Sequence, residues 1–333
     1  MSNIYITEKG IKISYKQGRL VCTPANGDAV SIPLAEVDSI SITDGVSLTS
    51  NSLASLLQKG APVTYMSGKG MVYGRLVSTK HVNINRQRKQ FRLGDNDEYC
   101  LSLSKKIISA KINNQIVLLK RYNRVPQSQE VKHLIEKILA LKNPFERANS
   151  ISSAMGFEGV SARYYFLALS KLVNENFKFI GRNRMPPTDE FNSLLSYGYT
   201  ILLYEIFNAL ENKGLNPYAG YLHKDKHGHP ALASDLLEEW RAIIVDSLAV
   251  NMVNNYGILK SDFDRNEGVK AVYIKKTGKQ KFIQGLEKKL DVEVAYFADE
   301  QMSFRKGIEL QVMKLVRSIE EGNADLYTPI KIR

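Results

Sequence analysis

Cysteine is nearly absent from this chain of 333 residues, which contains Cys22 and Cys100 and no others. Two cysteines do not make the disulfide framework of a small secreted domain, and they exclude a cysteine-rich zinc motif. A low cysteine content is typical of proteins that work in a reducing cytoplasm. We therefore expect a cytoplasmic protein.

Long apolar runs are also missing. No stretch reaches the length of about 18 uninterrupted apolar residues that a membrane-spanning helix needs. The first residues lack the basic segment followed by an apolar stretch that marks a secretory signal. The sequence therefore predicts a protein that is neither exported nor bound to a membrane.

Acidic residues are in deficit. The chain has 46 Lys and Arg against 34 Asp and Glu, for a formal net charge of +12. Such an excess favours a polyanionic partner, nucleic acid above all, although net charge alone is a weak indicator. The hydrophobic content of 44% is enough for one large or two moderate folded domains.

The first part of the chain, residues 1–76, is predicted to be a small β-rich domain. Short runs rich in β-branched and aromatic residues alternate with turn signals, for example at residues 11–15, 39–42 and 63–65. One helical stretch over residues 52–59 ends before Gly60, a residue type that commonly stops a helix.

A basic segment follows at residues 77–96. No acidic residue lies between positions 79 and 92, while basic residues recur there: Lys80, Arg86, Arg88, Lys89 and Arg92. The composition fits a linker or the start of a basic helix, and it fits a nucleic-acid contact or a solvated face equally well. These alternatives stay open at this level.

Residues 97–333 have the periodicity of helices and are predicted to form a larger, mainly α-helical domain. Residues 272–283 are the exception, because two apolar runs flank a polar tip at Thr277 and Gly278, the form of a β-hairpin. Its four lysines would make it a positively charged lysine finger: Lys275, Lys276, Lys279 and Lys281. The predicted fold class is therefore α+β, with this hairpin late in the chain.

One candidate site residue is Glu158, which stands between Gly156 and Gly159 where a helical stretch is expected to start. Flanking glycines would let backbone or a ligand approach its carboxylate closely. The alternative is a glutamate that merely complements the helix dipole in a first turn.

A second candidate segment is a loop rich in Pro and Gly that ends at His223 and leads into a helix with Asp235 and Glu238. Because these two acids lie three positions apart, both project from one helix face. The alternative is a solvent-facing acidic stripe, in which Glu238 pairs with Arg241. The histidines at 223, 227 and 229 do not favour zinc, because no thiolate lies near them.

The chemistry of these residues points to a hard divalent cation. Two carboxylates and one imidazole suit Mg²⁺ or Mn²⁺ better than a structural Zn²⁺. Such a metal activates an attacking hydroxyl and stabilises the charge that develops on a phosphodiester.

Three ordered blocks carry a resemblance to a known family. They are Gly156-x-Glu158-Gly159-x-x-Ala162-Arg163-x-Tyr165-Phe166, Asn216-Pro217-x-x-Gly220-x-Leu222-His223 and Ala231-Leu232-Ala233-x-Asp235-Leu236-x-Glu238-x-x-Arg241. They resemble the signature blocks of the CRISPR adaptation integrase, the family of CRISPR-associated protein one. The resemblance covers nearly the whole chain, since that family also has a small N-terminal β domain and a larger helical domain.

The resemblance implies metal ligands at Glu158, His223 and Glu238, with Asp235 as a second acid that supports catalysis. It implies a prokaryotic enzyme that inserts short DNA fragments, called prespacers, into the repeats of a CRISPR array. The 3′ hydroxyl of each fragment would attack an array phosphodiester directly. It also implies a homodimer formed through the N-terminal domains, in a larger complex with a small second adaptation protein.

Several basic residues are candidates for contacts to the DNA backbone. They are the lysine finger, the basic segment, Arg163, Lys224 and the pair Arg182 and Arg184. Tyr164 and Tyr165 are candidates for stacking on a splayed base, although core packing is expected for at least one of them.

Two other functions and one question of mechanism stay open. The protein could be a metal-dependent nuclease or resolvase that hydrolyses branched DNA, or an architectural DNA binder without catalysis. His223 could be a metal ligand or a general acid toward the leaving oxygen, because an imidazole near neutral pH does either.

Overall fold

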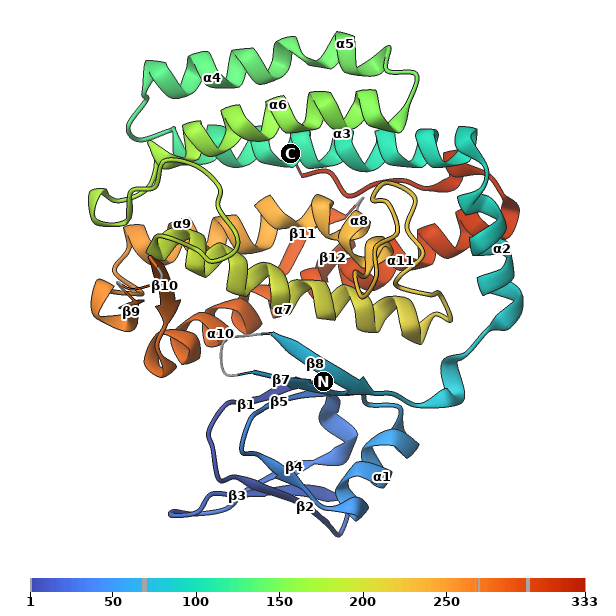
Figure 1. Ribbon diagram of the computed structural model, residues 1–333, viewed down its shortest axis with the longest axis vertical. Helices are drawn as coiled ribbons and strands as arrows, with labels where there is room; N and C mark the ends of the chain where they lie inside the picture. The colour runs from blue at the N-terminus through green and yellow to red at the C-terminus, as the bar shows by residue number, and fades with distance from the viewer. Residues whose placement is uncertain (1, 68–70, 267, 269, 298–299, 333) are drawn as a thin grey trace. The chain divides into compact units, whose positions relative to one another are not determined.

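The chain divides into two compact units, Met1–Val82 and Asn83–Arg333 (Figure 1). The computed structural model describes residues 2–67, 71–266, 268, 270–297 and 300–332. Within those ranges, no helix is long and apolar enough to cross a membrane. The α+β class predicted from the sequence is confirmed, with a strand-rich first unit and a mainly helical second unit.

The described part of the first unit contains two four-stranded sheets. In one, the strand order is β1-β5-β7-β8, with β8 antiparallel to β7 and the other pairs parallel. In the other, the order is β4-β3-β2-β6. The strands are β1 (Ser2–Ile6), β2 (Lys12–Lys16), β3 (Arg19–Thr23), β4 (Val30–Pro33), β5 (Val37–Thr43), β6 (Ser47–Leu48), β7 (Val63–Met66) and β8 (Val72–Leu76).

Alternation of apolar residues explains the core of this unit. Ile13, Leu20, Ile40 and Ile42 are completely buried, each on the inward face of its strand. Helix α1 (Ser50–Lys59) adds Leu56 to the same core. The helix ends as expected at Gly60, whose φ of 92° is readily adopted by glycine.

The second unit begins inside the basic segment, where helix α2 (Ile84–Gly94) forms. It then contains α3 (Asp97–Tyr122), α4 (Gln129–Ala140), α5 (Lys142–Glu146), α6 (Ile151–Ser170), α7 (Glu190–Asn212), α8 (Ala231–Trp240), α9 (Ser247–Asn254), α10 (Lys276–Asp291) and α11 (Phe304–Glu321). Helix α3 packs against α6 on one side and α8 on the other, and α4 covers α6 (Figure 1).

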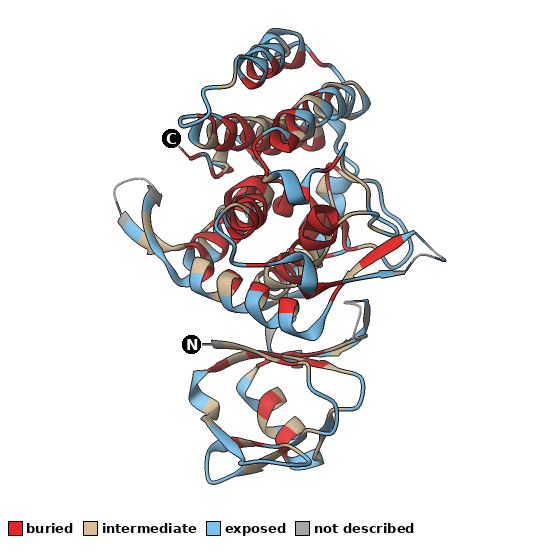
Figure 2. Ribbon diagram, turned by 90° about the vertical axis from the view of Figure 1, so that its left-hand side faces the viewer, coloured by how far each residue is buried: buried red, intermediate tan, exposed pale blue. Residues whose placement is uncertain are grey.

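Helix α8 lies at the centre of this unit, where Figure 2 shows buried residues concentrated. All of its 10 residues are buried, including three acids. The same helical path continues as a π-helical segment at Arg241–Asp246 and then as α9. A π-helical turn inside a helix is frequent at functional sites.

The late hairpin exists, but its predicted position is wrong. Strand β10 (Ala271–Ile274) pairs with β9 (Phe263–Asn266), which precedes it, and a second hairpin joins β11 (Glu293–Phe297) to β12 (Glu300–Ser303). The expected return strand at residues 281–283 lies inside helix α10.

The physical reason is a helical repeat around the supposed turn. Gly278, Phe282, Leu286 and Leu290 recur every four residues and are all buried. At Gly278 a Cβ atom would lie 2.8 Å from the backbone oxygen of Asp262, so this glycine permits close packing and does not form a turn. The four lysines therefore belong to a helix and its N-cap, not to the tip of a finger.

Candidate active site

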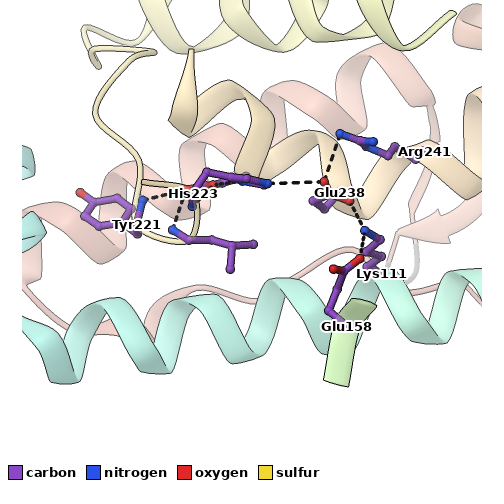
Figure 3. Close-up of polar contacts among 8 residues, drawn as sticks. Lys111, Glu158, Tyr221, His223, Glu238 and Arg241 are labelled. Carbon is purple, nitrogen blue, oxygen red and sulfur yellow. Dashed lines mark hydrogen bonds and ion pairs between the residues drawn. The ribbon is translucent and has the colours of Figure 1, made fainter. Parts of the chain in front are cut away.

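The site gathers around Glu238, in the last turn of the buried helix α8. Its side chain is only 6% exposed. Arg241 reaches Glu238 Oε1 from the following turn at 3.1 Å, and Lys111 of α3 reaches Glu238 Oε2 at 2.5 Å (Figure 3). Burial raises the pKa of Glu238, but the charges of Arg241 and Lys111 outweigh it and lower the pKa to about 2. The carboxylate is therefore ionised at neutral pH. Because the side chain is buried, the alternative of a solvent-facing acidic stripe is excluded.

Glu158 meets the same lysine from another helix. It lies about two turns inside α6, so it does not complement the helix dipole in a first turn. Its Oε1 makes an ion pair with Lys111 Nζ, and the side chain is 22% exposed. The ammonium of Lys111 thus lies between the carboxylates of Glu158 and Glu238 (Figure 3).

The glycines beside Glu158 leave space next to it. A Cβ atom at Gly156 or Gly159 would meet no atom of the described chain within 4 Å. Glycine in a helix interior costs roughly 0.5–1 kcal/mol relative to alanine. These two glycines therefore do not serve helix packing, and the open surface beside Glu158 is accessible to a ligand.

His223 reaches the site from the loop between α7 and α8, and Asp235 positions it. Asp235 is completely buried. Its Oδ2 accepts hydrogen bonds from the backbone N–H groups of Tyr221 and Leu222, at 2.7 and 3.0 Å. Its Oδ1 lies 3.0 Å from the backbone nitrogen of His223 and 2.7 Å from His223 Nδ1. One carboxylate therefore fixes both the loop and the imidazole ring.

This arrangement leaves the other ring nitrogen facing the site. His223 Nε2 lies 3.9 Å from Glu238 Oε1. Burial lowers the pKa of His223, but the hydrogen bond and charge of Asp235, with the charge of Glu238, raise it above its usual value. An imidazole held by a carboxylate on its far nitrogen is the usual arrangement of a metal-binding histidine.

The loop is held from its outer side by Gln90 of α2. The Gln90 side-chain amide donates to the backbone oxygens of Asn216 and Ala219 at 2.7 and 2.9 Å, and its oxygen accepts from the Asn216 N–H at 2.8 Å. At Gly220 a Cβ atom would lie 2.9 Å from Asp235 Oδ2. Glycine is therefore required where the loop crosses the start of α8.

A buried polar cluster lies behind Arg241. The Arg241 guanidinium stacks on the ring of Tyr199 at 4.7 Å. Tyr199 and Tyr165 donate hydrogen bonds to Asp246 at 2.5 and 2.6 Å. Burial raises the pKa of Asp246 to about 6 against the opposing effect of these hydrogen bonds. The cluster fixes Arg241, and it removes Tyr165 from the candidates for base stacking.

The other predicted DNA contacts are placed as follows. Arg163, Lys224, Lys275 and Lys276 are exposed, and Lys279 is half-buried over the ring of Tyr197. Arg182 is held inside the unit by Asn192 and Ser196, so its guanidinium is a structural group.

Sequence reasoning missed Lys111 and Gln90. Lys111 is one lysine among several in α3, and Gln90 stands in a segment whose basic residues dominate its composition. Lys111 falls on the buried, mostly apolar face of α3, so a charged residue within that apolar pattern was the signal that the sequence offered.

The donor set fits a hard divalent cation by its chemistry. Oxygens of Glu158 and Glu238 and Nε2 of His223 are suitable ligands. Glu238 Oε2 is buried and has the ammonium of Lys111 beside it at 2.5 Å, so a positive charge already lies where this oxygen would bind a metal. Within the described ranges, no three His, Cys, Asp or Glu side chains are already gathered at metal-binding distances. Lys111 lies where the two glutamates approach one another.

Comparison with known proteins places the chain in a family. A family described as CRISPR associated protein Cas1 matches residues 4–288. A CRISPR-associated endonuclease Cas1 of Mycobacterium tuberculosis is 30% identical over 334 aligned positions, covering 100% of this chain and 98% of the relative.

Two solved structures share the fold. A casposase bound to integration product matches with a TM-score of 0.85 at 22% identity, covering 97% of this chain and 92% of the casposase. A Cas6-RT-Cas1–Cas2 complex matches with a TM-score of 0.82 at 22% identity, covering 100% of this chain and 36% of the matched chain. The family match and the full-length relative show that this chain belongs to the CRISPR-associated protein Cas1 family.

Proposed function

We propose that the protein is a metal-dependent DNA integrase and endonuclease of CRISPR adaptation. The observation that carries this proposal is the convergence of Glu158, His223 Nε2 and Glu238 on one region. Full-length relatives named as Cas1 endonucleases support a nuclease, and the matched casposase, solved with an integration product, supports strand transfer. The net charge of +12 favours DNA as the substrate.

Glu158, His223 and Glu238 would hold Mg²⁺ or Mn²⁺, which supplies Lewis-acid polarisation of the reacting phosphate oxygens. Asp235 keeps Nδ1 of His223 engaged and Nε2 directed at the site. Arg241 and Lys111 keep Glu238 ionised. These residues supply geometry and charge that are in place before the DNA arrives.

The reaction exchanges one phosphodiester for another. A bond forms between the 3′ oxygen of a prespacer and an array phosphorus, while the bond from that phosphorus to the array 3′ oxygen breaks. The attacking hydroxyl loses a proton and the leaving oxygen gains one. The alternative role of His223 is to donate that proton from Nε2 instead of binding the metal, because its raised pKa increases the protonated fraction near neutral pH. With water as the attacking group, the same site would hydrolyse DNA.

Two-ended insertion requires two active sites at a fixed spacing. We propose that the chain forms a homodimer through its N-terminal unit and assembles with a small second adaptation protein. The matched Cas6-RT-Cas1–Cas2 complex supports such a partner. We place the protein in the prokaryotic cytoplasm.

The deciding experiment uses branched DNA that mimics a half-integrated prespacer, with a labelled 5′ end on the target strand. An integrase reseals the target strand and releases the flap, because transesterification passes through one transition state in both directions. Glu158→Ala, His223→Ala and Glu238→Ala should each abolish the joined product and leave DNA affinity nearly intact, since many Lys and Arg share phosphate binding. Shortened fragments alone, under every condition, would identify a hydrolytic nuclease. Binding without any cleavage would identify an architectural protein.

A further inference from the structure

Lys111 is the residue on which the two glutamates of the site meet. It projects from α3, and its side chain is only 11% exposed. Its Nζ makes ion pairs with Glu158 and with Glu238, which belong to two other helices. A buried lysine placed between two carboxylates is costly to desolvate, and it persists when the charges compensate each other.

The two cations around Glu238 differ in how firmly they are held. The planar guanidinium of Arg241 lies over the ring of Tyr199 at 4.7 Å while it pairs with Glu238, so it is fixed from two sides. Lys111 carries a compact ammonium on a flexible stem of four carbons, whose tip moves by rotation about single bonds. Of these two cations, Lys111 is the one that can withdraw without disturbing the aromatic cluster.

We propose that Lys111 is the resident counter-cation of the metal-free site, which holds Glu158 and Glu238 together and competes with the divalent metal for them. This inference rests on the metal site of the proposed function. Two carboxylates brought together without a cation repel each other, so the site needs a positive charge before metal binds. Lys111 is thus a positioning residue that sets metal affinity.

A purely structural ion pair would behave differently. If Lys111 only cross-links helices, its removal destabilises the protein and leaves the metal no better bound. If it competes with the metal, its removal destabilises the metal-free protein and strengthens metal binding at the same time. Opposite signs of these two effects distinguish the roles.

The test measures Mn²⁺ affinity, by electron paramagnetic resonance of the free ion, in the full chain without DNA. Lys111→Met keeps most of the length of the unbranched side chain and removes its charge. We expect the Kd for Mn²⁺ to fall at least about tenfold, because one like charge is removed from within a few ångströms of the bound cation. The Tm of the metal-free variant should be lower than wild type, and saturating Mn²⁺ should raise it by more.

Lys106→Met is the matched control. Lys106 lies on the same helix and pairs with Asp325 at the surface, at 3.0 Å, so its loss should leave the Mn²⁺ Kd unchanged. Lys111→Gln is measured beside Lys111→Met, so that the test does not depend on one variant folding.

The outcomes separate this inference from the function on which it rests. Unchanged or weaker Mn²⁺ binding in the Lys111 variants, with wild-type binding still lost in Glu158→Gln and Glu238→Gln, overturns the role of Lys111 and leaves the metal site intact. No Mn²⁺ binding to wild type or to either Lys111 variant overturns the metal site and this inference with it.

Discussion

Asp235→Asn is the substitution whose effect follows most directly from the geometry. The two carboxylate oxygens each lie beside two nitrogen donors, at 2.7 to 3.0 Å. An asparagine replaces one oxygen by an amide nitrogen, which cannot accept from the backbone N–H groups on its side, so up to two of the four hydrogen bonds disappear. Hydrogen bonds to charged groups contribute about 1.5–3 kcal/mol each. We therefore expect a destabilisation of up to about 6 kcal/mol.

The loss of stability should depend on pH with a defined sign. Asp235 contributes to the raised pKa of His223, and a raised folded-state pKa stabilises the protein. That stabilisation is fully present below the unfolded pKa of about 6.5 and is lost as the pH rises through the higher folded value. The stability difference between wild type and Asp235→Asn should therefore be larger at about pH 5.5 than at about pH 8.5.

Urea denaturation at the two pH values measures this difference, with Asp225→Asn as the control. Asp225 is an exposed residue of the same loop, so its amide variant should unfold like wild type. Strand transfer by Asp235→Asn should fall about 10–100-fold, the usual effect of losing the group that orients a metal-binding histidine. A stability difference that is equal at both pH values would refute the assigned His223–Asp235 coupling.

Three further predictions concern the surface and the cofactor. Gly156→Ala should raise the free energy of unfolding by about 0.5–1 kcal/mol, since the new methyl group meets no described atom. The same variant should lower strand transfer if DNA approaches there. Thermal melts measure the stability, and gel assays measure the strand transfer. Replacing Lys275 and Lys276 by Gln should weaken DNA binding and reduce the slope of log affinity against log salt by about one for each phosphate that is no longer bound. An unchanged slope would show that these two lysines are solvated surface residues that do not contact DNA. Chelation should abolish strand transfer, with Mg²⁺ or Mn²⁺ restoring it and Ca²⁺ restoring it poorly; full activity after exhaustive chelation would contradict the metal mechanism.

Local sequence patterns predicted the fold well where a single element determines the result. The stop of α1 at Gly60 and the alternation in β5 follow from rules that act over a few residues. The prediction of a hairpin at residues 272–283 was wrong because Gly278 was interpreted as a turn residue. Its role is set by Asp262, which lies close only after folding.

In the candidate site, too, local spacing predicts some residues, whereas others are brought together only by folding. His223, Asp235 and Glu238 lie within one short stretch, so their spacing could be interpreted before folding. Lys111 is separated from Glu158 by 47 positions, and nothing in the neighbourhood of either residue indicates that they form an ion pair. Pairings between helices distant in sequence are set by tertiary packing, which a single chain's periodicity does not reveal.

The hydrogen bonds of Gln90 determine where a truncated form of the protein can begin. A fragment that begins at residue 97, where the helical pattern becomes evident in the sequence, would lack α2. The backbone groups of Asn216 and Ala219 would then lose their partners, and the loop that carries His223 would lose its outer support. A fragment beginning at Asn83, whose side chain accepts a hydrogen bond from the Arg86 N–H and caps α2, retains them. The unit that contains the candidate site therefore starts inside the basic segment, whose composition fits a linker or the start of a helix equally well.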